Sequence, residues 1–251
     1  MPSSAAKNNA LAKSNAKADS APATSASNSQ VHGRKGLEAR AKLKRAAMTV
    51  LEERGYHAMR IADVTGEAGV ATGLFYHYFS DLKTLTLEVL SDFVAQSRNL
   101  EEIERGLDRT DWFGRMLAHN RLVVNSYAER PGLMRCLLQM ADEDPAFSAQ
   151  LRENFVESLH WLVARMPKLF PQAEFTEHQA LLLVYSVAGC GEMLLRDYFI
   201  NHDAALHSKE VSIDELVELL SVTFYRGLFA QNPPAEKLKY TCYVRGMVLT
   251  D

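Results

Sequence analysis

The side chains with the most evident chemistry are hydroxyl and imidazole groups within one short segment. Tyr76, His77 and Tyr78 follow one another, and Thr72 precedes Tyr76 by four residues. Such groups donate and accept hydrogen bonds, and on a short helix they could meet phosphate oxygens or the edges of nucleic-acid bases. Leu74, between them, could touch a thymine methyl group. The segment therefore has the chemistry of a surface that contacts DNA.

The apolar spacing before this segment predicts a helix that begins near Ile61 and stops at Gly69. Ile61, Val64 and Ala68 fall on one face, and Gly69 can take the positive φ that a tight turn demands. Val70 then fills the corner. A helix, a turn of three or four residues containing Gly, and a second short helix make the helix-turn-helix plan.

The second helix is expected over Gly73–Phe79, and the hydroxyl of Thr72 could cap its start. Phe75 and Phe79 are four residues apart and would face inward, so the polar and aromatic residues between them would point outward. A helix of this kind fits the major groove of B-DNA. The spacing leaves one alternative open, an ordinary helical hairpin whose aromatic residues are all core.

An earlier helix is expected over Leu37–Arg54, with Gly55 as its stop. Its N-terminal half is basic, with Arg34, Lys35, Arg40, Lys42, Lys44 and Arg45. These cations could lie against DNA phosphates or form a solvated face. Net charge is +2 over residues 1–33, +3 over residues 34–83 and −8 over the remainder, a total of −3. A basic head on an acidic body is typical of a nucleic-acid binder with a separate regulatory domain, although chance could produce it.

The segment GYHAMRIADVTGEAGVATGLFYHYFSDLKTL closely resembles the DNA-binding head of TetR-family transcriptional regulators. The shared features are the Gly55-Tyr56 stop, the Val64-x-x-x-Ala68-Gly69-Val70 hinge, the Gly73-x-Phe75-Tyr76-x-Tyr78-Phe79 helix and a long helix starting at Asp81 or Leu82. The resemblance implies an all-α homodimer with a three-helix helix-turn-helix head and a C-terminal helical domain for ligand binding and dimerisation.

The resemblance also implies roles for individual residues. Thr72 and Tyr76 would approach phosphates, and Gly73, Leu74 and His77 would lie closest to base edges. The complete set of candidate DNA-contacting residues is Arg45, Arg60, Thr72, Gly73, Leu74, Tyr76, His77, Tyr78 and Lys83.

The sequence departs from the family pattern at four positions. Arg60 replaces the capping Ser or Thr of the second helix, and Ala71 replaces the Ser or Thr that opens the third. Thr72 replaces a basic residue, and Leu82 replaces a Lys, with Lys83 one position late. We expect Arg60, Thr72 and Lys83 to take over these phosphate contacts. Weaker DNA binding is the alternative.

The body is predicted to be a series of amphipathic helices. They span Asp81–Arg105, Asp111–Glu129, Leu133–Met140, Pro145–Met166, Thr176–Ile200 and Ser212–Ala230. The resemblance implies that the first connects the head to a ligand pocket and that the last two form a four-helix bundle across a dimer axis. Completion of the monomer core is the alternative for that pair. The acids at 142–144 are expected to favour a helix start rather than bind a metal.

The composition of the body suits an apolar or aromatic small-molecule effector with a few orienting polar contacts. The candidate ligand-binding residues are Trp112, Met116, Asn120, Arg135, Gln139, Trp161, Tyr185 and Glu192. Each of them is also compatible with an ordinary place in the core.

Several other classes of function are disfavoured. Cys136, Cys190 and Cys242 lack disulfide or zinc spacing, and no motif for a catalytic triad, a zinc protease or a phosphate-binding loop is found. We therefore expect no enzyme activity, no cofactor and no metal. The sequence has no unbroken apolar run of membrane-spanning length and no secretory signal, so we expect a cytoplasmic protein without a membrane partner.

We divide the chain into a disordered tail (1–33), a helix-turn-helix DNA-binding domain (34–82), a helical ligand-binding and dimerisation domain (83–232) and a C-terminal tail (233–251) of unassigned role. The resemblance implies a homodimeric transcriptional repressor that binds double-stranded DNA at a pseudo-palindrome and leaves it when a small apolar or aromatic effector binds. A helical enzyme and a non-DNA-binding dimer are the alternatives.

Overall fold

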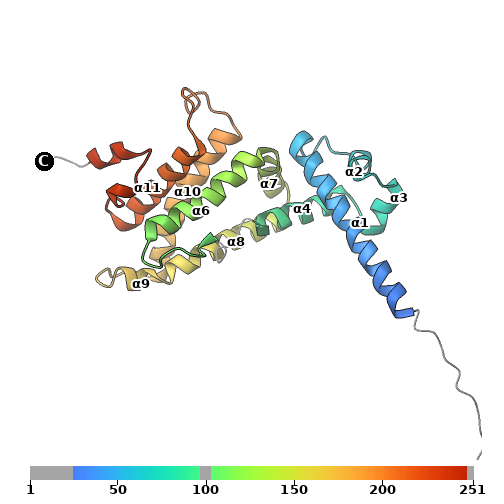
Figure 1. Cartoon of the computed structure of the whole chain (residues 1–251), viewed down its shortest axis with the longest axis horizontal. Helices are drawn as coiled ribbons and strands as arrows, with labels where there is room; N and C mark the ends of the chain where they lie inside the picture. Colours follow the sequence, from blue (N-terminus) through green and yellow to red (C-terminus); the bar gives the residue numbers. More distant parts are fainter. Residues whose placement is uncertain (1–24, 97–102, 248–251) are drawn as a thin grey trace, which may run out of the picture. The chain divides into compact units, whose positions relative to one another are not determined.

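The computed structural model describes residues 25–96 and 103–247, with side chains described from residue 36 onward. All regular elements of this part of the chain are helices (Figure 1). They are α1 (Ser25–Arg54), α2 (Ile61–Ala68), α3 (Thr72–Tyr78), α4 (Leu82–Gln96), α6 (Trp112–Glu129), α7 (Pro131–Glu143), α8 (Pro145–Val163), α9 (Met166–Leu169), α10 (Glu177–Phe199), α11 (Ile213–Phe229), η1 (Ala235–Lys237) and η2 (Cys242–Gly246). The chain divides into two compact units, residues 1–40 and residues 41–251, and the packing described below lies within the second.

The start of α1 differs from the prediction. The helix begins at Ser25 and not at Leu37, so residues 25–33, expected to be part of a disordered tail, are helical. The polar composition of this stretch gave no reason to expect order, but it contains no Pro, and extending an existing helix adds one hydrogen bond for each residue fixed. Residues 1–24 of the expected tail, and the side chains of Arg34 and Lys35, lie outside the described residues.

The turn between α2 and α3 is as predicted. Gly69 has φ 61°, and its N–H donates to the carbonyl of Gly66, while the N–H of Val70 donates to the carbonyl of Thr65. These bonds satisfy carbonyls that the end of α2 leaves open, and they reverse the chain direction. Phe75 and Phe79 are buried, as predicted, so they anchor α3 on the core of the head.

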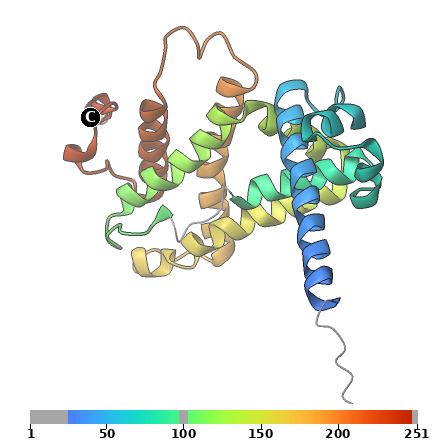
Figure 2. The ribbon, with the colours of Figure 1, turned by 45° about the vertical axis from the view of Figure 1, so that its right-hand side comes forward.

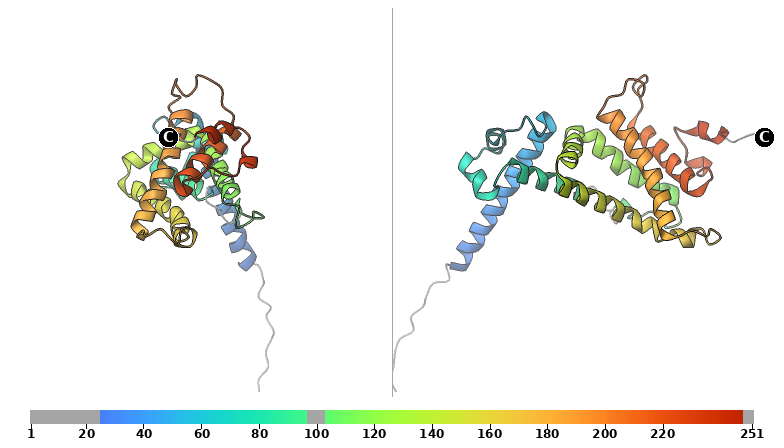
Figure 3. Two further views of the ribbon diagram at one scale, coloured as in Figure 1. Left: turned by 90° about the vertical axis from the view of Figure 1, so that its left-hand side faces the viewer. Right: turned by 180° about the vertical axis from the view of Figure 1, so that it is seen from behind.

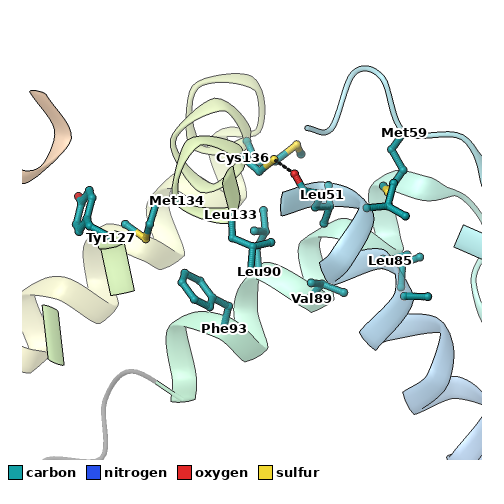
Figure 4. Packing of buried hydrophobic residues seen from close by; sticks show 14 of the residues in the cluster. Leu51, Met59, Leu85, Val89, Leu90, Phe93, Tyr127, Leu133, Met134 and Cys136 are labelled. Carbon is teal, nitrogen blue, oxygen red and sulfur yellow. Dashed lines mark hydrogen bonds between the residues drawn. The ribbon is translucent and has the colours of Figure 1, made fainter. Parts of the chain in front are cut away.

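One apolar core continues from the head into the body. Leu51 of α1, Leu85 and Leu90 of α4, and Leu133 of α7 belong to the same buried cluster. Figure 4 shows these side chains converging between α1, α4 and α7. Because protein interiors are closely packed, a displacement of α7 would also displace side chains of α1 and α4.

The rest of the body is built around α6, α10 and α11. These three helices pack on one another, and α8 packs against both α7 and α10 (Figures 1 and 3). A long loop, residues 200–212, joins α10 to α11 (Figure 2). The helix bounds agree with the predicted ranges to within three residues, except for the helix predicted over Asp81–Arg105. There α4 is described from Leu82 to Gln96, residues 97–102 lie outside the described residues, and residues 104–106 form a turn.

The C-terminal segment, for which the sequence suggested no role, folds back on α6 and α11. Leu238 and Val244 are buried in a small cluster with Phe113 and Val222. The carboxylate of Glu218 accepts backbone hydrogen bonds from residues 239, 240 and 241 at 2.8–3.0 Å, and the Thr241 hydroxyl donates a further bond at 2.7 Å. One buried acid on α11 therefore fixes this segment.

Among the described helices, α10 alone is long and apolar enough to cross a membrane, with a mean hydropathy of 1.2. A single helix of this kind is weak evidence for a membrane span. Ala180, Val184 and Leu195 of α10 are buried within the helical body, which accounts for part of its apolar character.

Candidate functional site

The outer face of α3 carries the polar groups that the sequence singled out. Thr72, Gly73, Tyr76 and His77 are exposed, and Tyr76 retains 61% of its accessible surface. Neither the Tyr76 hydroxyl nor the Thr72 hydroxyl has a hydrogen-bond partner among the described residues. Leu74 and Tyr78 are half-buried. Two buried Phe residues hold α3 on the head. Its outer face therefore presents an exposed aromatic side chain with a free hydroxyl, which is available to an external partner.

The start of α3 differs from the prediction. Thr72 is the first helical residue, and Ala71 occupies the N-cap position without a side-chain cap. Thr72 therefore does not cap the helix, because a capping hydroxyl must stand one position before the first helical residue. Its hydroxyl remains available for an outside partner.

Arg60 stands at the N-cap of α2, and the capping carboxylate comes from Asp63. Asp63 accepts the N–H of Arg60 at 2.8 Å and also pairs with Arg54 at 2.7 Å. The Arg60 guanidinium donates to the carbonyl oxygens of His57 and Met59. Asp63 thus satisfies the N–H of the N-cap residue, while no side chain replaces the usual hydroxyl cap of the first turn.

The head cations differ in their availability. Arg45 and Lys42 are exposed, whereas Lys44 pairs with Glu88 and Asp92. Lys83 pairs with Asp144 at 2.7 Å, and this contact raises the pKa of Lys83. Lys83 would have to leave Asp144 before it could reach a phosphate.

Glu52 joins the head to the start of α7. Its two carboxylate oxygens accept the N–H groups of Gly132 and Leu133, each at 2.9 Å. Both donors belong to the first turn of α7, where N–H groups have no partner within the helix and where a negative charge is favoured. The thiol of Cys136 adds a weak bond to the carbonyl of Leu51 (Figure 4).

The far end of α7 is also tied to the head. Glu143 lies 2.7 Å from His57, and Asp144, just beyond the helix, holds Lys83. Asp144 is at the same time the N-cap of α8, accepting the N–H of Phe147 at 2.9 Å, which is the helix-start role predicted for these acids. Both ends of α7 are therefore bound to the head.

The inner face of α7 lines a cavity of about 640 Å³ in the body. Met134, Leu137 and Leu138 come from α7, and the remaining wall comes mainly from α6, α8, α10 and α11. The size lies within the usual range for small-molecule sites, and the lining is largely apolar and aromatic. Trp112 and Trp161 stack there with ring centroids 6.4 Å apart.

A few polar groups interrupt this apolar lining. Arg115 lies over Trp112 and Trp161 and pairs with Glu104 at 2.7 Å. Burial lowers the pKa of His119, whose Nδ1 has no hydrogen-bond partner in the described part of the chain. Tyr127 donates to Glu192 at 2.6 Å. A few polar groups in an otherwise apolar cavity are typical of small-molecule sites.

Comparison with known proteins assigns the head to a family. Residues 43–89, which cover the end of α1 through most of α4, match the family model of bacterial regulatory proteins of the tetR family. The chain belongs to the TetR family of transcriptional regulators. Its head is accordingly a helix-turn-helix head, and the relatives described next are transcriptional regulators and not enzymes.

The relatives of this TetR-family chain agree with that assignment. It is 33% identical over 86 residues to the HTH-type transcriptional regulator YdgC of Bacillus subtilis, a match that covers 33% of this chain and 44% of that protein. It is 30% identical over 138 residues to the HTH-type transcriptional regulator CymR of Pseudomonas putida, covering 51% and 66%. The chain thus spans less than two thirds of each of these curated relatives.

Solved structures share the complete helical architecture. A TetR-family regulator structure from Mesorhizobium loti superposes with a TM-score of 0.58 at 17% identity, covering 79% of this chain and 98% of that one. At this identity the likeness concerns the fold alone. The family fold, with a helix-turn-helix head and an all-helical C-terminal domain, is confirmed.

Most of the residues chosen as ligand contacts in this TetR-family regulator do line the cavity. They are Trp112, Met116, Asn120, Trp161, Tyr185 and Glu192. Arg135 and Gln139 do not line it, which corrects the prediction. On α7 the cavity face is formed by positions 134, 137 and 138, which are three and four residues apart, and positions 135 and 139 lie on another face of the helix.

Sequence reasoning missed Glu52, His119, Tyr127 and Glu218. The role of Glu52 could not be predicted because its hydrogen-bond partners lie about 80 positions away in the sequence. The same holds for Tyr127, whose partner lies 65 positions away. A signal existed for His119 and Tyr127, since both share the α6 face that carries Trp112 and Met116 at helical spacing.

Proposed function

We propose that this TetR-family regulator binds a pseudo-palindromic operator as a homodimer and releases it when a small apolar or aromatic effector enters the cavity of the body. The observation that carries the proposal is the double attachment of α7. The helix lines the cavity with three apolar side chains, and it is bound to the head at both ends. An effector that favours one position of α7 would therefore favour one position of the head.

We assign recognition of the operator sequence to α3. Two recognition helices of a dimer read successive major grooves when they stand about 34–36 Å apart. Thr72 and Tyr76 would donate to phosphates, and Gly73, Leu74 and His77 would face base edges. Arg45, Arg60, Tyr78 and Lys83 complete the proposed DNA-contacting set. An effector changes the DNA affinity only to the extent that it binds the two head spacings with different affinity.

The DNA contacts are tested by replacing Tyr76 with Phe and His77 with Ala together. We expect specific operator affinity to fall about 10- to 100-fold, because one hydroxyl and one imidazole hydrogen bond are lost at the interface. Fluorescence anisotropy with upstream DNA of the gene, at two salt concentrations, measures this change. Wild-type affinity should fall steeply as salt rises.

The matched control replaces the exposed body residues Tyr243 with Phe and His178 with Ala, and it should bind operator like the wild type. A wild type without salt-dependent specific binding would support a non-DNA-binding dimer instead. A double variant that keeps full affinity would move the interface away from α3.

The dimer interface is assigned to the outer faces of α10 and α11. Leu182, Leu183 and Met193 of α10 are exposed, at 53%, 42% and 61%, although the helix is largely apolar. An added Cβ at Gly227 of α11 would lie 2.8 Å from the Val187 side chain, so α11 packs closely against α10. Contiguous exposed apolar surface marks an association site.

Replacing Leu182 and Met193 with Glu should dissociate the dimer. Two carboxylates would be buried without partners, so we expect the dimer dissociation constant to rise at least about 100-fold. Sedimentation equilibrium measures it, with Tyr243→Glu as a control at an exposed site outside α10 and α11. If the double Glu variant remains a dimer of wild-type stability, the interface lies elsewhere. The proposed location of the dimeric regulator is the cytoplasm.

A further inference from the structure

Glu192 is a half-buried acid on the wall of the cavity. Its Oε2 accepts the Tyr127 hydroxyl at 2.6 Å, and Tyr127 is itself only 3% exposed. No described Lys, Arg or His lies within ion-pair distance of Glu192, and its other oxygen receives no hydrogen bond from the described residues. The cavity thus contains an acid that forms no ion pair with the described residues.

The cavity as it stands disfavours the ionised form of this acid. Burial raises the pKa of Glu192, and the Tyr127 hydrogen bond and the charge of Arg196 only partly oppose that effect. Burial likewise raises the pKa of Tyr127. A ligand that brings a positive charge to this wall would stabilise the carboxylate, since an opposite charge within about 4–6 Å favours ionisation.

At the other end of the cavity, the charged side chain already has an ion-pair partner. There the guanidinium of Arg115 is already matched by Glu104 and lies 4.7 Å from the centre of the Trp112 ring. The cavity face of α6 runs from Trp112 to Tyr127, and fifteen residues of helix at 1.5 Å each make it about 22 Å long. The site is therefore elongated, with an unmatched acid near one end and an aromatic wall near the other.

We propose that the effector is an elongated lipophilic cation, whose ammonium group donates to Glu192 and whose apolar body extends along α6 toward Trp112 and Trp161. This inference rests on the proposed function, because it takes the cavity as the effector site. Charge-assisted hydrogen bonds are roughly twice as strong as neutral ones, so the cationic end would contribute much of the selectivity.

Binding of a cation should be coupled to proton release. The charged or titratable groups that line the cavity or act on Glu192 are Arg115, His119 and Tyr127 of α6, Arg196 of α10, and Arg152 and Glu157 of α8. Burial keeps His119 neutral by lowering its pKa. Glu192 would therefore be the group that loses a proton when the ligand binds, and the affinity for a cation should rise as pH increases.

The experiment titrates the full-length protein with dodecylamine, 1-dodecanol and dodecanoate, which share one apolar body and differ in charge. Isothermal titration calorimetry, below the micellar concentration of each compound, gives the three affinities. We expect the amine to bind at least about tenfold more tightly than the alcohol, and dodecanoate to bind most weakly. The amine affinity should increase between about pH 5.5 and pH 8.5, where an alkylamine remains protonated.

In Glu192→Gln the preference for the amine over the alcohol should vanish, while the alcohol affinity stays within about threefold of wild type. The Gln side chain can still accept the Tyr127 hydroxyl, so the variant should fold, and the alcohol affinity verifies this. Glu157→Gln, an exposed acid at the same cavity, should keep the preference.

The proposal is overturned if the alcohol or dodecanoate binds as tightly as the amine, if none of the three binds, or if Glu192→Gln keeps the preference. Operator binding without ligand is measured on the same samples. If the wild type does not bind operator DNA, the proposed regulatory function is refuted. The preference of the cavity for a charged ligand can still be measured in that case.

Discussion

Replacing Gly132 with Ala should destabilise the junction between head and body by about 2–4 kcal/mol. A Cβ at this position would collide with the carbonyl oxygen of Glu52 and would lie 2.8 Å from both the carbonyl carbon and the Cα of that residue. These are backbone atoms of α1, so they cannot rotate away as a side chain could. Relief requires α1 and α7 to separate, which breaks the two hydrogen bonds to the Glu52 carboxylate.

Urea unfolding measures the loss, and hydrogen exchange at Gly132 and Leu133 locates it. Gly66→Ala is the matched control, because Gly66 lies within α2 and an added Cβ there meets nothing within 4 Å. Ala should make α2 slightly more stable. If Gly132→Ala is as stable as the wild type, the close approach of α1 and α7 does not exist in solution.

The same substitution has a consequence for regulation. If α7 transmits effector binding to the head, Gly132→Ala should reduce the factor by which an effector lowers operator affinity. This reduction should be larger than the change in effector affinity alone or in operator affinity alone. Such a change in coupling, measured with both ligands, separates transmission from simple loss of stability.

Glu218→Gln is expected to release the C-terminal segment at a loss of about 2–4 kcal/mol. Glu218 is only 4% exposed, and its carboxylate is surrounded by three backbone N–H groups and one hydroxyl. An amide has one oxygen instead of two and places an NH₂ group against donors, so some of these bonds are lost inside the core. Thermal unfolding and limited proteolysis after residue 230 report the change.

The pH dependence of this effect has a defined sign. Burial by itself raises the pKa of Glu218, but the bonds from Thr241, Lys239 and Tyr240 outweigh it and leave the pKa below its ordinary value. The contribution to stability is therefore complete above the unfolded-state pKa, near about 4.3, and is lost as pH falls through the lower folded-state value. The stability difference between wild type and Glu218→Gln should shrink below about pH 4.3.

Glu236→Gln, an exposed acid in the same segment, serves as the control and should change stability by less than about 0.5 kcal/mol. Equal losses in the two variants, or a Glu218 effect that grows toward low pH, would contradict the account of Glu218 as the residue that holds the segment.

Local signals predicted most of the helices. Gly69 marks the end of α2 because its backbone takes a positive φ, and Asp144 with Pro145 marks the start of α8 because a carboxylate accepts the free N–H groups of a first turn. Caps of this kind involve residues within about four positions of one another. They can therefore be read from sequence, as can the outward face of α3 between Phe75 and Phe79.

The limits of local signals are visible at the start of α1 and at the start of α3. The polar stretch 25–33 gave no hydrophobic period, yet it continues a helix that begins the head. Thr72 has the chemistry of a cap but stands one position too late. In both cases the first residue of the helix depends on the course of the backbone. Side-chain type alone does not determine where the helix begins.

The sequence by itself determined the helical class, the positions of the helices and the family of the head, because periodicity, caps and a short motif are local properties. Only the tertiary structure decided which groups the carboxylates of three acids contact. Glu52 meets the start of α7, Glu192 meets Tyr127, and Glu218 meets the C-terminal segment. The physical reason is that a buried carboxylate requires donors, and the helix packing brings those donors from distant parts of the chain.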